Sequence, residues 1–183
     1  MDSTEHIYEQ VLVLRAQAGD EASFEQLVKR KSPALRYYLG AMLGPQVSAE
    51  DALQEVWLAV YRGLRRLSDP RAFAAWAYRI ARVRAAGEIR KLRKMQPLVE
   101  ESAEVVAETE EEDFTAEEVA EVHAALARIG VLHREVLVLR FMEDWTYEQI
   151  AQVLGCPVGT VRSRLHHAKI SLRRMMQALH ERK

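Results

Sequence analysis

The chain of 183 residues has one cysteine, Cys156, so it cannot form a disulfide bond within itself. It also lacks any run of about 18 apolar residues, which is the length that a membrane-spanning helix requires. Its first residues contain no basic segment followed by a long apolar stretch, the pattern of a secretory signal. We therefore expect a cytoplasmic protein that does not insert into a membrane.

Residue patterns that supply catalytic chemistry are missing as well. The six histidines show no zinc-ligand spacing with carboxylates or with the cysteine, and no glycine-rich phosphate-binding loop occurs. His166 and His167 are adjacent, so on a helix they point about 100° apart and are poorly placed to share a metal. We expect no metal site, no cofactor and no catalytic residue in this chain.

Charge is distributed unevenly along the chain, although 49% hydrophobic and 29% charged residues are ordinary globular values and the net charge is only −1. Residues 1–94 contain 16 Lys and Arg against 11 Asp and Glu, and residues 121–183 contain 10 against 6. Residues 95–120 contain 10 acidic residues and no basic one. Carboxylates that repel one another favour an extended segment. The sequence therefore predicts two domains, 1–94 and 116–183, joined by a flexible acidic linker at 95–115.

The clearest local pattern lies between Thr146 and Arg174 and predicts two helices joined by a tight turn. Thr146 and Gln149 have the spacing of a capping box, in which each side chain satisfies the other residue's backbone N–H, so a helix begins there. Gly155 supplies a left-handed residue that ends this helix. After Pro157 a second helix follows, because apolar residues recur in steps of three and four, at Val161, Leu165, Ala168, Leu172, Met175 and Leu179. This arrangement is typical of a helix-turn-helix.

The other faces of the second helix carry hydroxyls and cations that suit DNA. The candidate residues are Thr160, Arg162, Ser163, Arg164, His166, His167 and Lys169. The start of such a helix enters the major groove, so Arg162, Ser163 and His166 are the candidates for base edges. The phosphate backbone is better matched to the remaining cations, Arg164, Lys169, Arg173 and Arg174. A merely solvated cationic face is the plainer alternative.

The N-terminal domain is also predicted to be helical, because no segment alternates polar and apolar residues as a strand would. Asp20 and Ser48 can each cap a helix that carries an apolar face. A third helix is expected from about Pro70, with one apolar side formed by Phe73, Trp76, Ala77, Ile80 and Val83. The predicted fold class is therefore all-α, with two small helical domains.

The third helix is strongly basic. From Arg71 to Lys94 there are 8 cations and a single carboxylate, that of Glu88. Such a density favours binding to nucleic acid, because each phosphate that is neutralised releases a condensed counterion. The sequence therefore predicts a DNA-binding helix in each of the two domains.

Four segments occur in a characteristic order and spacing. They are AEDALQEVWLAVYRGL (49–64), FAAWAYRIAR (73–82), the acidic linker, and the C-terminal run ALARI…HREVLVLR…TYEQIAQVLG…VGTVRSRL. With them the chain, from about Ala18 to Met176, resembles the extracytoplasmic-function (ECF) sigma factors, the smallest members of the sigma-70 family. The resemblance implies a bacterial transcription initiation factor that binds core RNA polymerase and directs it to minus-10 and minus-35 promoter elements, with catalysis left to the polymerase.

The resemblance implies that the helix matching Asp51–Tyr61 docks on the clamp helices of the largest polymerase subunit. The candidate core-binding residues are Asp51, Gln54, Glu55 and Trp57. Trp57 can equally be a buried core aromatic, because one tryptophan on an amphipathic helix can serve both purposes. The preference of a helix N-terminus for acids is a plainer explanation of Asp51, and a weaker one of Glu55.

By the same resemblance, the loop Leu67–Arg71 and the helix after it open the minus-10 element and capture a flipped base. Strand separation costs unpairing energy, which is recovered by holding single-stranded bases on aromatic or apolar surfaces in a basic groove. The candidates are Arg71, Tyr78, Arg79, Arg82, Arg84 and Arg90. Phe73 and Trp76 are assigned to the core, whereas Tyr78 lies off the apolar stripe and is expected to be available to DNA.

Four positions depart from the family pattern. Val83 stands where asparagine is common, Gly87 where aspartate is common, His167 where arginine is usual, and Gly130-Val131 where paired prolines are frequent. We therefore expect unusual promoter specificity. Gly87 also lowers helix propensity by about 1 kcal/mol relative to alanine, which favours bending or fraying of the basic half of its helix.

The resemblance further implies three partners: core RNA polymerase, promoter DNA and an anti-sigma factor that holds an otherwise monomeric free chain. The linker would approach the polymerase active centre, where its carboxylates imitate phosphates, although a solvated spacer explains them as well. Two other functions stay open. A two-domain helix-turn-helix regulator is one of them, but it gives no role to the segment 49–64 or to the basic helix at 71–94. A decoy that binds polymerase without opening DNA is compatible with Val83 and Gly87.

Overall fold

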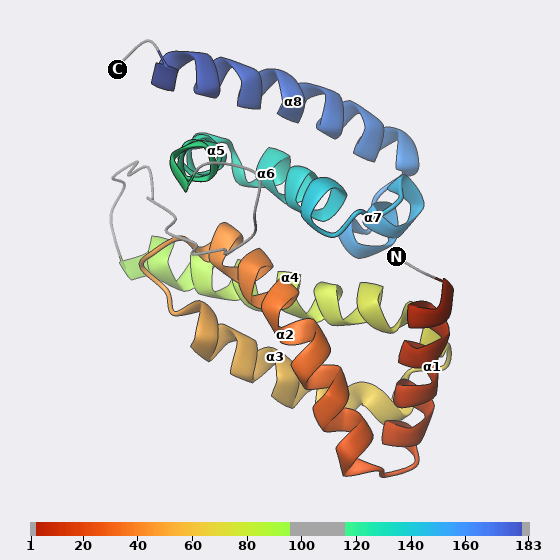
Figure 1. Ribbon diagram of the computed structural model, residues 1–183. Coiled ribbons are helices and arrows are strands. Elements are labelled where there is room, and N and C mark those ends of the chain that lie inside the picture. The colour runs from red at the N-terminus through yellow and green to blue at the C-terminus, as the bar shows by residue number, and fades with distance from the viewer. Residues whose placement is uncertain (1–2, 96–115, 181–183) are drawn as a thin grey trace.

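The computed structural model describes residues 3–95 and 116–180, and these residues contain helices and no strand, which confirms the all-α prediction (Figure 1). The N-terminal part consists of α1 (Ser3–Gln17), α2 (Glu21–Leu43), α3 (Ala49–Gly63) and α4 (Phe73–Met95), with the short 3₁₀ turns η1 (Leu64–Arg66) and η2 (Pro70–Ala72) between α3 and α4. The C-terminal part consists of α5 (Ala116–Arg128), α6 (Val131–Leu137), the π-helical turn η3 (Val138–Met142), α7 (Tyr147–Leu154) and α8 (Val158–His180). No helix in the described ranges is both long and apolar enough to cross a membrane.

The helices begin where side chains can satisfy their free backbone N–H groups. Asp20 accepts hydrogen bonds from the backbone of Ala22 and Ser23 at the start of α2, and Ser48 accepts one from Asp51 at the start of α3. Thr146 forms the full capping box of α7 with Gln149. All three predicted helix starts are confirmed.

The helix-turn-helix has the predicted geometry. Gly155 is left-handed, with φ 64° and ψ 39°, and it ends α7 before α8 begins at Val158. On α8, Val161, Leu165 and Ala168 are buried. The stripe of apolar residues therefore packs inward and leaves the polar sides of α8 to solvent.

Helix α4 has a different buried stripe from the predicted one. Phe73 and Ala77 are buried as expected, but the stripe continues through Ala81 and Ala85. Val83 was predicted to lie on this face, and that prediction is wrong, because its side chain is 70% exposed. Small alanines at every fourth position allow α2 and α3 to pack closely on α4. The helix also continues through Gly87 to Met95.

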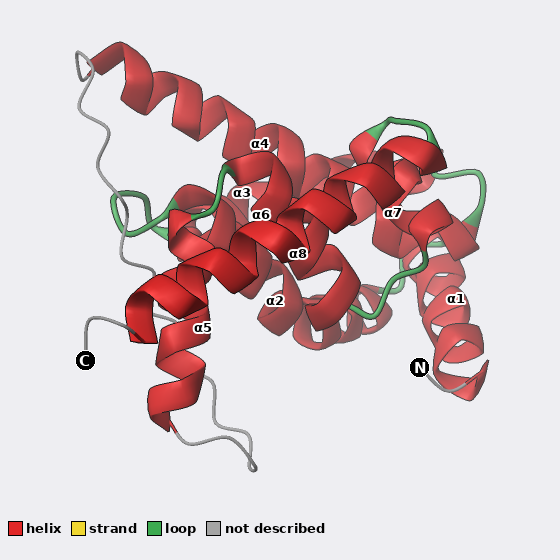
Figure 2. Ribbon diagram, turned by 90° about the horizontal axis from the view of Figure 1, so that it is seen from above, coloured by secondary structure: helices red, strands yellow, loops and turns green. Residues whose placement is uncertain are grey.

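The two helical parts pack directly on each other. In Figure 1, α4 and α2 lie on one side of α6 and α7, and α8 lies on the other side; seen from above in Figure 2, α8 is the outermost layer. Helix α4 contacts α7, and α2 contacts α6 and η3. One hydrophobic cluster runs through both parts. Helix α4 is consequently covered on two sides, by its own domain and by the C-terminal domain.

Candidate functional site

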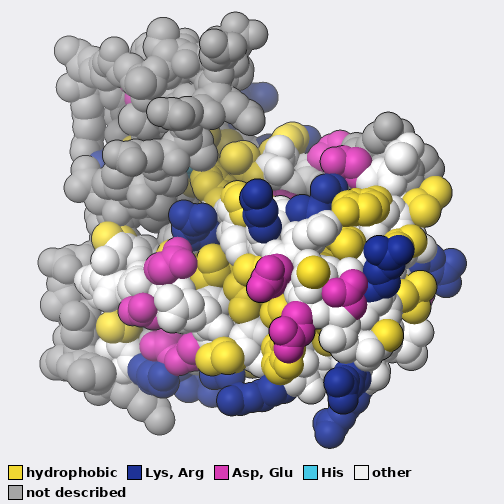
Figure 3. All heavy atoms as spheres, turned by 60° about the horizontal axis from the view of Figure 1, so that its bottom comes forward, with side chains coloured by type: hydrophobic (Ala, Val, Ile, Leu, Met, Phe, Trp, Pro, Cys, Tyr) yellow, Lys and Arg dark blue, Asp and Glu magenta, His cyan; other side chains and the backbone are white. Residues whose placement is uncertain are grey.

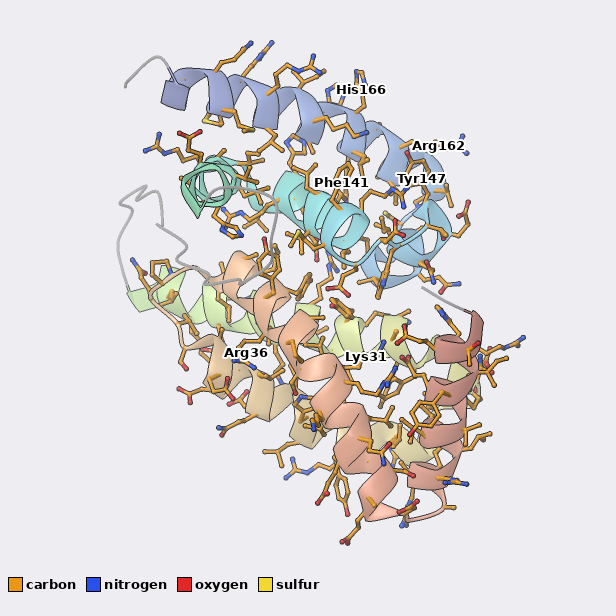
Figure 4. The ribbon with its side chains drawn as sticks, in the orientation of Figure 1. Lys31, Arg36, Phe141, Tyr147, Arg162 and His166 are labelled. Atoms are coloured by element: carbon orange, nitrogen blue, oxygen red, sulfur yellow. The ribbon has the colours of Figure 1, made fainter. Side chains whose placement is uncertain are left out.

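The outer side of α8 presents the residues predicted to contact the minus-35 element. Arg162, Ser163, His166, His167 and Lys169 are exposed, and Thr160 and Arg164 are half-buried. The Ser163 hydroxyl donates to the Thr160 carbonyl (3.1 Å), which holds it close to the helix axis. Figure 4 shows Arg162 and His166 on α8, away from the N-terminal helices. The helix thus offers a hydroxyl-bearing cationic surface of the width that a major groove accepts; which residue contacts a base stays a prediction.

An aromatic ring supports this surface from α7. The guanidinium carbons of Arg140 and Arg162 lie 5.8 and 5.9 Å from the ring centroid of Tyr147, within cation–π range (Figure 4). Arg140 also donates to the Trp145 carbonyl (2.8 Å). Arg140 and Tyr147 have no local sequence signal for this role, because a turn separates them from α8 and only the packing of α7 brings them to its start.

The predicted polymerase-docking helix, α3, forms a groove of about 480 Å³ with α2. Gln54 and Glu55 are exposed, as is Asp51. Trp57 is only 8% exposed, and its indole N–H donates to the Ser32 hydroxyl (3.0 Å). Trp57 thus packs in the core of the N-terminal domain, and its edge forms part of the groove wall. A contact between Trp57 and polymerase stays a prediction.

Two exposed apolar side chains of this groove were missed by the sequence analysis. Leu58 is 54% exposed and Tyr61 is 60% exposed. The Tyr61 ring packs edge-on against Phe24, with centroids 5.2 Å apart. Figure 3 views the molecule from this side, where apolar surface lies between acidic and basic side chains. The neighbourhood of apolar and charged groups is suited to a protein partner rather than to DNA.

The residues predicted to contact the minus-10 element divide into two sets. Exposed cations on or next to α4 are Arg71, Arg79, Arg84 and Arg90. Arg71 pairs with Asp69, and Arg84 pairs with Glu55 (3.2 Å), which links the predicted DNA face to the predicted polymerase face. Tyr78 and Arg82 form the second set, because both contact the C-terminal domain.

The prediction that Tyr78 is available to DNA is wrong for this structure, since its side chain is only 2% exposed. Its ring packs edge-on against Trp145 (4.7 Å) and Tyr38 (5.2 Å). Burial raises the pKa of Tyr78, and the nearby Glu143 carboxylate raises it further. Its hydroxyl has no hydrogen bond of good geometry among the described residues. Tyr78 belongs to the hydrophobic cluster, because Tyr38 of its own domain and Trp145 of the C-terminal domain both pack on its ring.

Polar contacts between the domains converge on Arg134 and Glu135 of α6. The Glu135 carboxylate, 4% exposed, accepts from the Tyr38 hydroxyl (2.7 Å) and from Nε of Arg82 (2.9 Å). Arg134 donates to the carbonyl of Ala41 (2.7 Å), near the end of α2. These two neighbouring residues therefore bind three groups of the N-terminal domain.

A further apolar groove, of about 550 Å³, lies between α5, η3 and α8. Phe141 and Met142 are 58% and 51% exposed at its edge. The ammonium of Lys169 lies 5.3 Å from the Phe141 ring centroid, so this cation borders both the groove and the predicted DNA face. This groove has no local sequence signal, because its walls come from separate helices that meet only in the folded chain. The acidic linker, 95–115, falls outside the described residues apart from Met95.

Comparisons with known proteins identify the family to which the chain belongs. Residues 27–95 match the family model of sigma-70 region 2, and residues 120–172 match that of sigma-70 region 4. The chain is 31% identical to the RNA polymerase sigma-H factor of Pseudomonas aeruginosa, over 93% of this chain and 95% of that protein. It is 29% identical to the ECF RNA polymerase sigma-E factor of Escherichia coli K12, over 96% and 98% of the two chains.

Solved structures show the same architecture. CnrH, in complex with the cytosolic domain of CnrY, matches with a TM-score of 0.72 and 26% identity over 93% of this chain and 98% of that chain. RpoE of Bartonella quintana, in complex with the anti-sigma factor NepR, matches with a TM-score of 0.69 and 22% identity over 84% and 96% of the two chains, which supports the fold alone. The chain therefore belongs to the sigma-70 family as an ECF RNA polymerase sigma factor, a promoter-recognising transcription initiation factor.

Proposed function

We propose that this sigma factor divides its work between two modules, 1–94 and 116–183, joined by the acidic segment 95–115. The first docks on core RNA polymerase and opens the minus-10 element, and the second binds the minus-35 element. The observation that carries this proposal is the presence of two different surfaces on the first module: the groove of α2 and α3, and the cationic side of α4.

Polymerase docking is assigned to the groove of α2 and α3. Gln54 and Glu55 supply exposed polar contacts at its edge, and Leu58 and Tyr61 supply exposed apolar area. Tyrosine is among the residues that most often dominate the binding energy of protein interfaces, so Tyr61 is the expected centre of this contact. Trp57 contributes mainly by holding α2 and α3 together.

Minus-35 recognition is assigned to the outer side of α8. Arg162 can form two hydrogen bonds with a guanine edge, and Ser163 and His166 lie on the same exposed side. Arg164 and Lys169 are assigned to phosphates. Minus-10 opening is assigned to the exposed arginines of α4 together with Tyr78 and Arg82, which requires that the C-terminal domain move away.

Tethering gives the two weak DNA contacts a combined affinity when the spacing of the promoter elements suits the span between the modules. We propose that polymerase sets that span. We also propose that the free chain is a monomer and that it acts in the cytoplasm, where polymerase and promoters are. CnrH was solved in complex with the cytosolic domain of CnrY, and RpoE in complex with the anti-sigma factor NepR. By analogy, we propose an anti-sigma factor for this chain.

Transcription from a randomised promoter library tests the proposal. Core polymerase with the wild-type chain is expected to give promoter-dependent RNA, whose sequences define both elements. The Gln54→Ala, Tyr61→Ala double variant is expected to lose RNA together with core binding. A Lys29→Ala variant, altered at an exposed position of α2 that does not line the groove, is the matched control. Core binding without promoter-dependent RNA would overturn the proposal and indicate a decoy.

A further inference from the structure

The α3–α4 loop, residues 64–72, is held by a side chain from α1. Gln17, the last residue of α1, donates from Nε2 to the backbone carbonyls of Leu64 (2.9 Å) and Leu67 (2.7 Å), which are 47 and 50 residues away in the chain. A side-chain amide nitrogen carries two hydrogens, so both are used. The reverse orientation would point the amide oxygen at two carbonyl oxygens, so the contact requires a donor here. One amide therefore fixes two points of the α3–α4 loop.

Helix α1 gives this amide a firm base. Leu12 and Val13 are buried in the hydrophobic cluster, and Glu9 pairs with Lys31 of α2. Helix α1 also contacts the turns η1 and η2, which belong to the α3–α4 loop (Figure 1). The position of the Gln17 amide is therefore set by the packing of α1 on α2, and not by the loop that it holds.

The far end of the α3–α4 loop is fixed as well. The Asp69 carboxylate accepts hydrogen bonds from the backbone N–H of Arg71 (3.0 Å) and from its Nε (3.0 Å). Pro70 begins η2 with a restricted φ. Ser68 lies between the two fixed ends and is exposed, whereas Leu67 is half-buried. The backbone of the loop is therefore preorganised, with its apex open to solvent.

The α3–α4 loop leads directly into the cationic side of α4. It carries Arg71, an exposed cation that was predicted to contact the minus-10 element. Capture of an unpaired base costs unstacking energy, and a flexible loop would add the entropic cost of ordering its own backbone. A loop that is already held at both ends avoids most of this second cost.

We propose that Gln17 is a positioning residue for the minus-10 element, because it holds the α3–α4 loop in the conformation that receives an unpaired base. Gln17 acts through the loop, since both hydrogens of its amide are donated to Leu64 and Leu67. This inference rests on the assignment of minus-10 opening to the first module under the proposed function. It extends the determinants of the minus-10 element to α1, a helix with no assigned contact to DNA or polymerase.

Removal of the amide donor tests this role. Gln17→Leu keeps the bulk of the side chain and deletes both hydrogen bonds, and Gln17→Asn is a milder variant that withdraws the amide by one methylene. Gln10→Leu is the matched control, because Gln10 is half-buried about two turns earlier on α1 and has no side-chain hydrogen bond to another described residue. Affinity for core polymerase and urea unfolding establish that each full-length variant is folded.

The measurement is the affinity of each holoenzyme for a promoter whose non-template strand is unpaired across the minus-10 element. Single abasic sites are placed at each minus-10 position in turn, and wild type is expected to lose affinity at the captured position. Gln17→Leu is expected to bind the intact strand about fivefold more weakly, as loss of one net hydrogen bond would give, and to lose little more at that abasic site. Gln17→Asn should lie between the two, and Gln10→Leu should match wild type.

The outcomes separate the role of Gln17 from that of the loop. An equal loss on intact and abasic strands in Gln17→Leu would indicate a purely structural role and overturn the proposal, as would wild-type binding by both Gln17 variants. If Gln17→Leu does not fold, the same criteria apply to Gln17→Asn. Insensitivity of wild type to every abasic site would instead overturn base capture by the first module, and the inference with it.

Discussion

At the scale of single residues, Tyr147 lies beside the predicted minus-35 surface and contacts two arginines. The guanidinium carbons of Arg140 and Arg162 lie 5.8 and 5.9 Å from its ring centroid. A guanidinium held over an aromatic face loses less side-chain freedom when it binds a base, because its orientation is already restricted. We therefore propose that Tyr147 positions Arg162 for the minus-35 element.

Arg162→Ala is expected to cost about 1–3 kcal/mol in promoter binding and to relax selectivity at one minus-35 position, as loss of a base contact would. Tyr147→Leu should reproduce part of this loss at the same position, and Tyr147→Phe should restore it. Competition of holoenzyme binding among minus-35 duplexes measures these differences. Uniform weakening across all sequences would assign Arg162 to a phosphate.

The pKa of His123 predicts a pH dependence. Burial lowers this pKa from its ordinary value near 6.5, and the ring nitrogen Nε2 lies 3.1 Å from the Tyr37 hydroxyl of the other domain. The native state therefore prefers neutral histidine, so this contribution to stability is complete above about pH 6.5 and is lost as the pH falls below it. Burial raises the pKa of Glu143, which acts in the opposite sense and stabilises the native state on acidification.

Because Glu143 is common to both chains, comparison of wild type with His123→Gln isolates the histidine. We expect the free energy of unfolding to fall more steeply in wild type between pH 7.5 and pH 5.5, as measured by urea titration. Parallel pH profiles would contradict the role of His123. Tyr37→Phe, which keeps the ring and removes the hydroxyl beside it, is a suitable control for the local contact.

At the scale of helices, the glycines Gly63 and Gly87 differ in whether packing requires the absence of a side chain. A Cβ at Gly63, the last residue of α3, would lie 2.8 Å from the Trp76 ring, so the absence of a side chain allows α3 and α4 to meet. A Cβ at Gly87 would meet nothing within 4 Å. Gly87 thus lowers the helix propensity of α4 without a packing reason, whereas Gly63 is required by the close approach of Trp76.

Gly63→Ala is therefore expected to destabilise the chain by about 1–3 kcal/mol through overpacking. Gly87→Ala is expected to stabilise it by up to about 1 kcal/mol through helix propensity. Thermal unfolding of the two variants measures both effects. Stabilisation by Gly63→Ala would mean that the Trp76 ring moves aside without cost.

The groove of α2 and α3 makes a prediction at the same scale. Tyr61→Ala is expected to weaken binding to core polymerase by about 1–2 kcal/mol, because it removes exposed aromatic area at the centre of the assigned contact. Asp51→Asn should change binding little, since a favourable position near the start of α3 explains this acid. Titration of labelled core polymerase with each variant measures the two affinities. An equal loss of affinity in both variants would mean that the contact extends to the start of α3.

At the scale of the whole molecule, the shared hydrophobic cluster predicts cooperative behaviour. The cluster runs from the N-terminal helices through Tyr78 and Trp145 into α7 and α8. Wild-type unfolding is therefore expected to be a single transition with coincident tryptophan fluorescence and far-UV circular dichroism. Glu135→Ala should separate the two curves, because it uncouples the domains. Separate transitions in wild type would contradict a common core.

Much of the local structure could be predicted from particular residues. Thr146, Gln149 and Gly155 defined α7, and Asp20 and Ser48 defined the starts of α2 and α3, because caps and left-handed glycines depend on neighbours within a few residues. The exposed side of α8 also followed from its apolar spacing. Val83 and Tyr78 were assigned wrongly, since the burial of a residue on α4 depends on which helices pack on each side.

The sequence alone determined the helices, the family and the cationic faces of α4 and α8, because periodicity, capping and charge are local properties of the chain. Only the tertiary structure decided which of those faces are open. The Glu135 carboxylate binds both Tyr38 and Arg82. Arg82 lies 44 residues after Tyr38 and 53 residues before Glu135, so this contact has no local signal in the sequence. The docking of the two domains depends on the complementarity of their folded surfaces, so only the tertiary structure determines it.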